Sequence, residues 1–212
     1  VTLDSSTEYY VLIDATAFDD LSGNSYAGIS STTAFSFTVA DTTNPTLTSS
    51  VPADNATGVA GNANIVLNFS ESVTTQTGDI IIKKTSDNSI AETIDVTSGQ
   101  VSGSGSAQIT VNPSVTLSSS IEYYVLIDAT AFDDTAGNSY AGISSTTALS
   151  FTIADTTDPT LTSSVPADNA TGVSVDANIV LNFSESVNTG SGNVTIKKTS
   201  DDSVIEAIDV TS

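Results

Sequence analysis

The stretch Asn64-Ile65-Val66-Leu67-Asn68-Phe69-Ser70 carries the clearest fold signal in the chain. Its apolar residues Ile65, Leu67 and Phe69 lie two positions apart, and side chains at that spacing point to one face of a β-strand. Branched and aromatic side chains fit a pleated surface, so the stretch predicts a strand with one buried face. The same seven residues recur at Asn178–Ser184, which places this strand twice in the chain.

The recurrence belongs to a much longer repeat. Residues 1–98 align with residues 115–212 without gaps at an offset of 114, and 20 of these 98 positions differ. A period of that length corresponds to a whole domain rather than to one turn of a solenoid. The chain therefore contains part of a tandem array of near-identical domains, an organisation that suits length, spacing or multivalency.

Two polar segments that end in proline mark the boundaries between repeats. Ala40–Pro45 and Ala154–Pro159 each follow a strand-like run, and a residue before proline favours extended conformations. We therefore expect three parts, which are the C-terminal part of one repeat, a complete repeat and the N-terminal part of the next: residues 1–40, 41–154 and 155–212.

The two outer parts are complementary. Together they correspond to a whole repeat except for the counterpart of Gly99–Ser114, so neither is expected to bury a full core alone. Two explanations stay open. The chain is a piece of a longer array, or the outer parts of successive molecules complete one another.

Seven apolar or alternating runs within the complete repeat predict strands. Turn-forming residues separate them, no amphipathic helical period appears, and the fold class is therefore all-β. Seven strands in about 114 residues are typical of an immunoglobulin-like β-sandwich. The runs are Pro45–Pro52, Asn64–Ser70, Asp79–Lys84, Ala91–Val96, Gln108–Pro113, Glu122–Asp128 and Ala148–Ile153.

The charge balance restricts the partners. The net charge is −21, and the only basic residues are four lysines. Phosphate binding needs a basic surface, so nucleic acid is excluded, and docking on anionic lipid is disfavoured. Such an acidic surface keeps a protein soluble and attracts cations. The sequence has no cysteine for disulfides and no apolar run of about 18 residues for direct membrane insertion.

Four signatures in the complete repeat, taken in order, resemble those of a known family. They are Val51–Val59 (VPADNATGV), Ile65–Val73 (IVLNFSESV), Glu122–Ile127 (EYYVLI) and Phe132–Asn138 (FDDTAGN). The repeat resembles bacterial Ig-like ("Big" type) tandem repeats of large extracellular adhesins and surface proteins. The resemblance implies an extracellular or cell-surface location and a role as a spacer or adhesive module, including in biofilm matrix.

Catalysis is not expected. The chain lacks histidine, cysteine and arginine, and it has no Gly-x-Ser-x-Gly elbow. Nucleophilic catalysis needs a base that this chain does not provide. We therefore predict that the protein is not an enzyme and holds no organic cofactor.

One loop of each repeat is a candidate calcium site. It gathers carboxylates and an amide, and calcium takes six to eight oxygen ligands in flexible geometry. The alternative is that these residues form only Asx turns. The candidates are Asp128, Asp133, Asp134 and Asn138, with their counterparts Asp14, Asp19, Asp20 and Asn24 in the first part.

The repeat junctions are a second candidate calcium site. Asp41, Asp155 and Asp158 lie between repeats and could meet Asp54 or Asp168 of the following repeat, so that a cation would stiffen the hinge. A solvated polar linker is the alternative. Glu71 and Glu185, each at the end of a Phe-Ser-Glu run, are weaker candidates.

Three functions stay open. The first is a structural extender of a bacterial surface protein or matrix filament, which calcium could stiffen. Its partners would be the neighbouring repeats of the same chain. The second hypothesis is self-association into fibres, in which a part-domain of one subunit completes its neighbour by β-augmentation. The third is a glycan- or protein-binding module whose site lies on the loop at residues 129–147.

Overall fold

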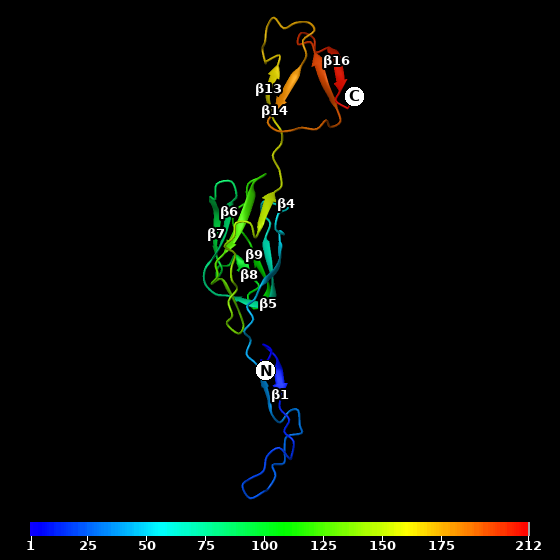
Figure 1. Cartoon of the computed structure of the whole chain (residues 1–212). Coiled ribbons are helices and arrows are strands. Elements are labelled where there is room, and N and C mark those ends of the chain that lie inside the picture. Colours follow the sequence, from blue (N-terminus) through cyan, green and yellow to red (C-terminus); the bar gives the residue numbers. More distant parts are fainter. Residues whose placement is uncertain (212) are drawn as a thin grey trace. The chain divides into compact units, whose positions relative to one another are not determined.

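The computed structural model describes residues 1–211, which divide into two compact units after Thr156. Each unit is treated by itself. All regular structure in the described residues is β-strand (Figure 1), in agreement with the predicted all-β class. None of these residues belongs to a helix that could cross a membrane.

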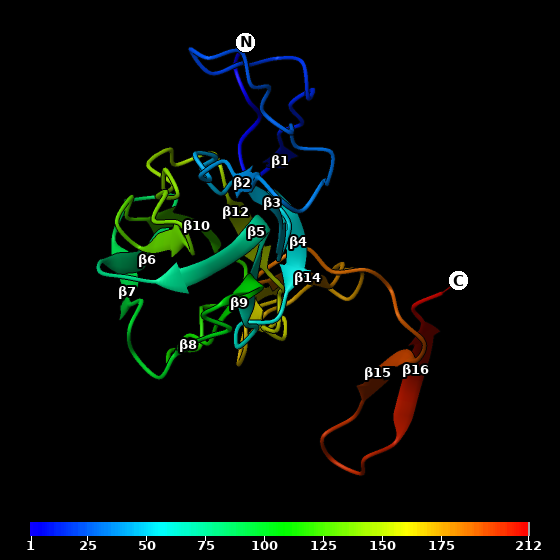
Figure 2. The same ribbon diagram turned by 90° about the horizontal axis from the view of Figure 1, so that it is seen from below.

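The complete repeat is a sandwich of two sheets (Figure 2). The first sheet has the order β4-β12-β10-β6-β7, in which β12 pairs in parallel with β4 and the other pairs are antiparallel. Its strands are β4 (Ala56–Val59), β12 (Ser150–Ile153), β10 (Glu122–Ile127), β6 (Asp79–Lys84) and β7 (Ile90–Asp95).

The second sheet is organised around one long strand, β5 (Ile65–Thr75). Its order is β11-β5-β9-β8, and β3 also pairs with β5, beyond the end of β11. The partners are β3 (Leu47–Val51), β8 (Val101–Ser102), β9 (Ser106–Val111) and β11 (Phe132–Asp134).

The core lies between the two sheets, and the quoted stretch is at its centre. Ile65, Leu67 and Phe69 are all buried, which is the outcome that their period-two spacing predicts. The Phe69 ring contacts two aromatic rings from the neighbouring strand β11 and the loop that follows it, with centroids 5.4 Å from Phe132 and 5.1 Å from Tyr140. Aromatic pairs in such tilted or edge-to-face arrangements stabilise a core beyond their buried area.

Each of the seven predicted runs contains a strand, but the structure has three further strands. Two of them lie in segments between the predicted runs, where only turns and connections were expected: β4 between the first two runs, and β8 between the runs Ala91–Val96 and Gln108–Pro113. The predicted loop at 129–147 contains β11. All three are short. β8 pairs with β9, which follows it directly in the chain, whereas β4 and β11 form because the distant strands β12 and β5 supply their hydrogen bonds. Local sequence does not reveal such partners.

The outer parts contain isolated hairpins. In residues 1–40, β1 (Glu8–Tyr10) pairs with β2 (Ser36–Thr38). In the second unit, β13 (Leu161–Val165) pairs with β14 (Val180–Phe183), and β15 (Asn193–Lys197) pairs with β16 (Val204–Asp209). Many apolar side chains whose counterparts are buried in the complete repeat are exposed in these parts, Phe18, Phe37 and Phe183 among them.

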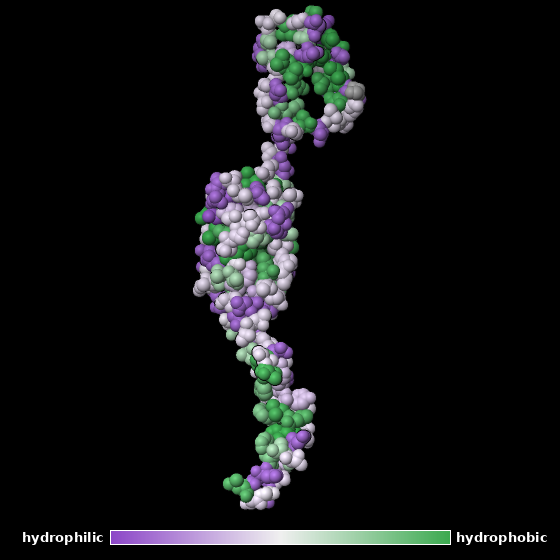
Figure 3. Space-filling view, viewed as in Figure 1, coloured by the Kyte–Doolittle hydropathy of each residue, from purple (hydrophilic) through white to green (hydrophobic). Residues whose placement is uncertain are grey.

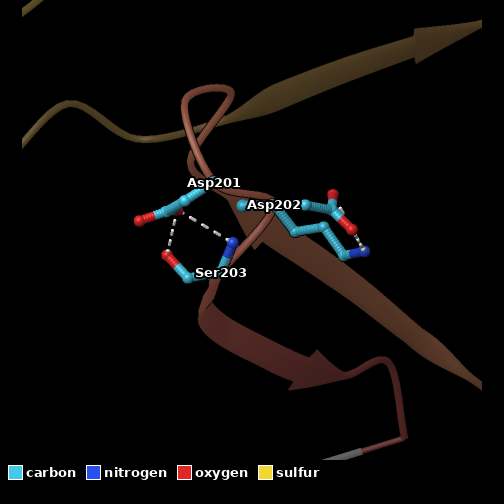
Figure 4. A network of polar contacts seen from close by, with 4 residues as sticks. Asp201, Asp202 and Ser203 are labelled. Carbon is cyan, nitrogen blue, oxygen red and sulfur yellow. Dashed lines mark hydrogen bonds and ion pairs between the residues drawn. The ribbon is translucent and has the colours of Figure 1, made fainter.

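The turn between β15 and β16 shows how local sequence sets a hairpin (Figure 4). The Asp201 carboxylate accepts hydrogen bonds from the Ser203 amide at 3.1 Å and from its hydroxyl at 2.7 Å. Asp87 holds Ser89 in the same way in the complete repeat. Position 88 differs: Asn88 accepts a hydrogen bond from the Tyr124 hydroxyl, whereas its counterpart Asp202 forms an ion pair with Lys197 at 3.2 Å.

Candidate metal centre at the repeat junction

Strand alternation separates the two adjacent aspartates of β11. Asp134 is buried on the side of the strand that carries Phe132, whereas Asp133 lies on the other side and is half-buried. The loop that follows β11 folds back onto Asp134. Its carboxylate accepts hydrogen bonds from the backbone amides of Ala136 and Asn138, both at 2.8 Å, and from the Asn138 side-chain amide at 2.8 Å.

Glu71 reaches the same place from β5. The register between β5 and β9 shifts between Asn68 and Val73, so Glu71 lies within an irregular segment of the strand. Bulges of this kind commonly re-aim a side chain next to a functional site. On the other edge of β5, Val73 is the register partner of Asp134, which brings the end of β11 alongside this segment.

Asp41 comes from the linker that precedes the complete repeat. Its carboxylate accepts hydrogen bonds from the Ser5 hydroxyl at 3.0 Å and from the Thr43 amide at 2.9 Å. Its backbone carbonyl accepts a hydrogen bond from the Asn138 side chain at 3.3 Å. Asp41 therefore contacts both the preceding part-domain, through Ser5, and the complete repeat, through Asn138.

These three acids form one cluster. Single carboxylate oxygens of Asp41, Glu71 and Asp134 lie within 4.8 Å of one another. Calcium–oxygen distances are about 2.3–2.6 Å, so one ion between these oxygens could contact all three carboxylates. Backbone carbonyls and waters would supply the remaining ligands. The donor set consists of hard, charged oxygens, which fits calcium better than a metal that prefers nitrogen or sulfur.

The pKa values of the cluster diverge. Burial raises the pKa of Glu71, and the negative charges of Asp134 and Asp41 raise it further. Burial also opposes ionisation of Asp134, but the hydrogen bonds from Asn138 and Ala136 outweigh it and lower its pKa. The hydrogen bonds from Thr43 and Ser5 lower the pKa of Asp41. A cation would relieve the repulsion that Glu71 experiences when it is ionised.

The residues predicted to bind calcium thus lie in several different parts of the structure. Asp134 of the loop and Asp41 of the junction, predicted for two separate sites, lie in one cluster, and Glu71 completes it. The Asp128 carboxylate instead accepts a hydrogen bond from the Asp79 amide at 2.9 Å and anchors the start of β6. Asp133 belongs to no described carboxylate cluster of three or more.

Asp54, which the sequence placed as a possible partner of the junction acids, is not among the three acids of the described cluster. Its carboxylate accepts a hydrogen bond from the Ser150 amide at 2.9 Å. The loop that carries Asp54 is therefore attached to β12 of its own repeat, because the backbone amide there needs an acceptor.

The first part of the chain repeats the loop geometry without the cluster. Asp20 accepts hydrogen bonds from the Asn24 amide and side chain, both at 2.8 Å, as Asp134 does from Asn138. Asp14, Asp19, Asp20 and Asn24 are all exposed. Because the turn forms in both settings, its local sequence suffices to shape it.

The second junction repeats only part of the arrangement. The Ser119 hydroxyl donates a hydrogen bond to Asp155 at 3.0 Å, just as Ser5 does to Asp41. Asp158, which replaces Asn44, is exposed. Among the described residues, a cluster of three carboxylates forms only around Asp41.

The fold and its repeats define the class as immunoglobulin-like β-sandwich modules in tandem. The family model described as a bacterial Ig-like domain (Big_5) matches residues 41–153 and 155–212. The chain therefore belongs to the bacterial Ig-like domain family, as its sequence signatures indicated. Domains of this family are typically structural modules without enzymatic activity.

Similarity to other known proteins is distant. No curated protein matches the chain. Among solved structures, the N-terminal part of the bacterial S-layer protein SbsC is 15% identical with a TM-score of 0.37, over 77% of this chain and 37% of that one. The S-layer protein rSbsC(31-844) is 14% identical with a TM-score of 0.36, over 80% and 24% respectively. This chain thus spans well under half of either protein.

Proposed function

We propose that this chain is a run of structural repeats that extends and spaces other parts of a bacterial extracellular or cell-surface protein, and that calcium stiffens the junction between repeats. Family membership supports the structural role, because bacterial Ig-like domains are typically non-enzymatic modules. The close similarity of the repeats supports it as well, since a spacer needs only identical units joined in series.

The position of Asp41 carries the calcium part of the proposal. This linker residue contacts Ser5 of the preceding part-domain and lies with Glu71 and Asp134 of the following repeat. An ion held by all three carboxylates would tie the linker to the following repeat, while the Ser5 bond holds it to the preceding one. Bending at the junction would then break metal–ligand bonds, so binding would restrict the hinge.

Electrostatics supports the same conclusion. Three carboxylates in one place repel one another, and the chain has only four lysines against 25 acidic residues. Partial burial at the junction reduces the screening of this repulsion by water. A divalent cation removes the repulsion and adds ligand bonds, so the folded junction is expected to prefer the calcium-bound form.

Thermal unfolding of the whole chain with calcium and with excess chelator tests the binding. A ligand at a hundredfold excess over its dissociation constant stabilises the folded state by about 2.7 kcal/mol. For a domain of this size that corresponds to a rise in Tm of roughly 8–12 °C. Magnesium at matched ionic strength controls for screening of the acidic surface.

A pair of equivalent variants assigns the site. Glu71→Gln should abolish the calcium-dependent rise in Tm, because it removes one of three charged ligands. Glu185→Gln is the matched control, since it alters the same position of the repeat at a place where the described residues form no cluster of three acids. A calcium response that both variants retain would contradict the proposed site.

Stiffening needs its own measurement. The chain contains no cysteine, so spin labels can be placed at Leu21→Cys and Ser86→Cys without background. Both positions are exposed and lie on the two sides of the Asp41 junction. Calcium should narrow the distribution of distances between the labels, and a distribution that calcium leaves unchanged would contradict a role in stiffening.

A further inference from the structure

The linkers between repeats consist of polar residues followed by a proline. They are residues 41–45 and 155–159, in which aspartate, threonine and asparagine precede the proline. Figure 3 shows hydrophilic and pale side chains along the second linker, which precedes β13. A segment of this composition gains little from burying its own side chains, so hydrogen bonds decide how much of it is held in place.

The start of each linker is bound to the repeat that precedes it. At the second linker, the Thr156 amide donates a hydrogen bond to Oγ of Ser119 at 2.9 Å, and this hydroxyl donates one to Asp155 at 3.0 Å. Ser119 belongs to the complete repeat and lies shortly before β10. Ser5 makes the same two hydrogen bonds at the first linker, also at 2.9 and 3.0 Å. The first two residues of each linker are therefore anchored to the preceding repeat.

The end of each linker is bound to the repeat that follows it. The Thr46 amide donates a hydrogen bond to Oγ of Ser70 on β5 at 3.0 Å, and the Ser70 amide donates one to the Thr46 carbonyl at 2.9 Å. Pro45, which precedes Thr46, is buried. Ser184 holds Thr160 with the same pair of hydrogen bonds, at 2.9 and 2.8 Å. From Pro45 onwards, the chain is thus anchored to the following repeat.

Little of the linker remains between these two anchors. Thr43 still has a contact with the preceding repeat, because its hydroxyl lies 3.4 Å from Oγ of Ser5. Asn44 is exposed, and the proline after it keeps it in extended conformations. The ring of Pro45 fixes its own φ. Two residues span at most about 7 Å even when fully extended, so the segment between the anchors allows limited bending and almost no separation of the repeats.

We propose that bending between successive repeats is confined to residues 43–44 of the first linker and 157–158 of the second, because a serine on either side anchors the rest of the linker to a repeat. The anchors consist of hydrogen bonds within the protein, so they act whether or not calcium binds at the junction. The array is therefore semi-rigid in its metal-free form, and calcium would restrict a hinge that is already short. The two linkers differ only inside this hinge, where Asp158 replaces Asn44, whereas the anchoring serines are the same in both.

Backbone ¹⁵N relaxation of the whole chain in excess chelator tests this proposal separately from calcium binding. Order parameters should be about 0.85, the value of a rigid backbone, at Thr46 and Thr156. At Asn44 and Asp158 they should fall clearly lower, toward the roughly 0.6 that marks a flexible backbone. The proposal is overturned if Thr46 and Thr156 are as mobile as the two hinge residues, or if the hinge residues are as rigid as the strands.

Serine substitutions test the two anchors of the complete repeat, with amide hydrogen exchange as the measurement. Ser119→Ala removes the acceptor of the Thr156 amide, which should then exchange about tenfold faster or more, while the exchange of Thr46 stays unchanged. Ser70→Ala should accelerate Thr46 in the same way and leave Thr156 unchanged, so each variant is the control of the other. Unchanged thermal unfolding of the complete repeat checks that both variants are folded. Unaltered exchange of Thr156 in the first variant, or of Thr46 in the second, would show that these serines do not anchor the linkers.

Discussion

Glu71 on β5 and Asp134 on β11 point their carboxylates toward the same space, with oxygens within 4.8 Å of each other and of Asp41. They are 63 residues apart in sequence (134 − 71), and strand pairing brings them together through the Val73–Asp134 register. Their proximity raises the pKa of Glu71 beyond the effect of burial. Repulsion between them is therefore a measurable property of the junction.

The stability of the metal-free protein should depend on Glu71 and on pH. The folded state binds the Glu71 proton more tightly than the unfolded chain does, because its pKa is raised on folding. This contribution to stability is present below the unfolded pKa and is lost as the pH rises through the raised folded pKa. In chelator, Glu71→Gln should therefore raise the Tm at neutral pH by a few degrees and leave it unchanged in acid.

The pH series of thermal unfolding measures this effect, with Glu185→Gln again as the control. A variant that is less stable than the unaltered chain at neutral pH in chelator would show that the ionised Glu71 is not repelled. With calcium the sign should reverse, because the glutamine variant loses a charged ligand.

A second carboxylate should have the opposite pH dependence. Glu92 is buried, which opposes its ionisation, yet hydrogen bonds from Ser114 at 2.6 Å and Gln100 at 2.8 Å outweigh the burial and lower its pKa. Its stabilisation is present above the unfolded pKa and is lost as the pH falls through the lowered folded pKa. Glu92→Gln should cost about 2–3 kcal/mol at neutral pH and much less in strong acid.

Chemical denaturation of Glu92→Gln at both pH values provides the measurement. Glu206→Gln is the matched control, because Glu206 is the exposed counterpart of Glu92 in the second unit. An equal loss at neutral and acid pH would indicate a packing defect instead of lost charge-assisted hydrogen bonds.

The aromatic cluster should dominate the core energy of the complete repeat. Phe69→Ala removes the ring that contacts Phe132 and Tyr140 and leaves a cavity, and such substitutions cost about 3–5 kcal/mol. Phe183→Ala alters the same position in the second unit, where the side chain is exposed. The denaturation midpoint of the complete repeat should fall only for the first variant, and equal effects would contradict the assigned core.

Gly142 should be intolerant of a side chain. Its φ is +74°, and an added Cβ would lie 2.4 Å from the Ile127 carbonyl oxygen, against the bridge between Ile127 and Ile143. Gly137 has a φ of +92° with open space around it. Gly137→Ala should cost about 1 kcal/mol from backbone strain alone, and Gly142→Ala should cost clearly more. Equal losses of unfolding free energy in a denaturation series would show that backbone strain, and not the close contact with the Ile127 carbonyl oxygen, determines the cost of both substitutions.

Much of the fold can be predicted from short stretches of sequence. The alternation in Ile65–Phe69 places three side chains in the core. Each predicted run contains a strand, because the apolar residues that its pattern assigns to one face are the ones that the sandwich buries. The strands that the pattern misses, β4, β8 and β11, have two to four residues each. β4 and β11 depend on partners far along the chain, and so does the buried position of both Tyr123 and Tyr124.

The candidate site, too, could be predicted only in part from the sequence. Acidic residues in the loop and the linker are visible in sequence, and the Asp134–Asn138 turn forms from local residues, as its recurrence at Asp20–Asn24 shows. Glu71 gave only a weak signal. Its place in the cluster depends on the register shift along β5, which no local pattern encodes.

The sequence by itself therefore determined the repeat, the strand class, the acidity and the family signatures, because these depend on neighbouring residues and on composition. Tertiary structure alone decided which acids meet. Strand alternation turns Asp133 away and Asp134 inward, the irregular segment of β5 brings Glu71 beside it, and the linker brings Asp41 to both. A charge cluster arises from long-range pairing, and the energy of that pairing comes from the core and not from the charges that it assembles.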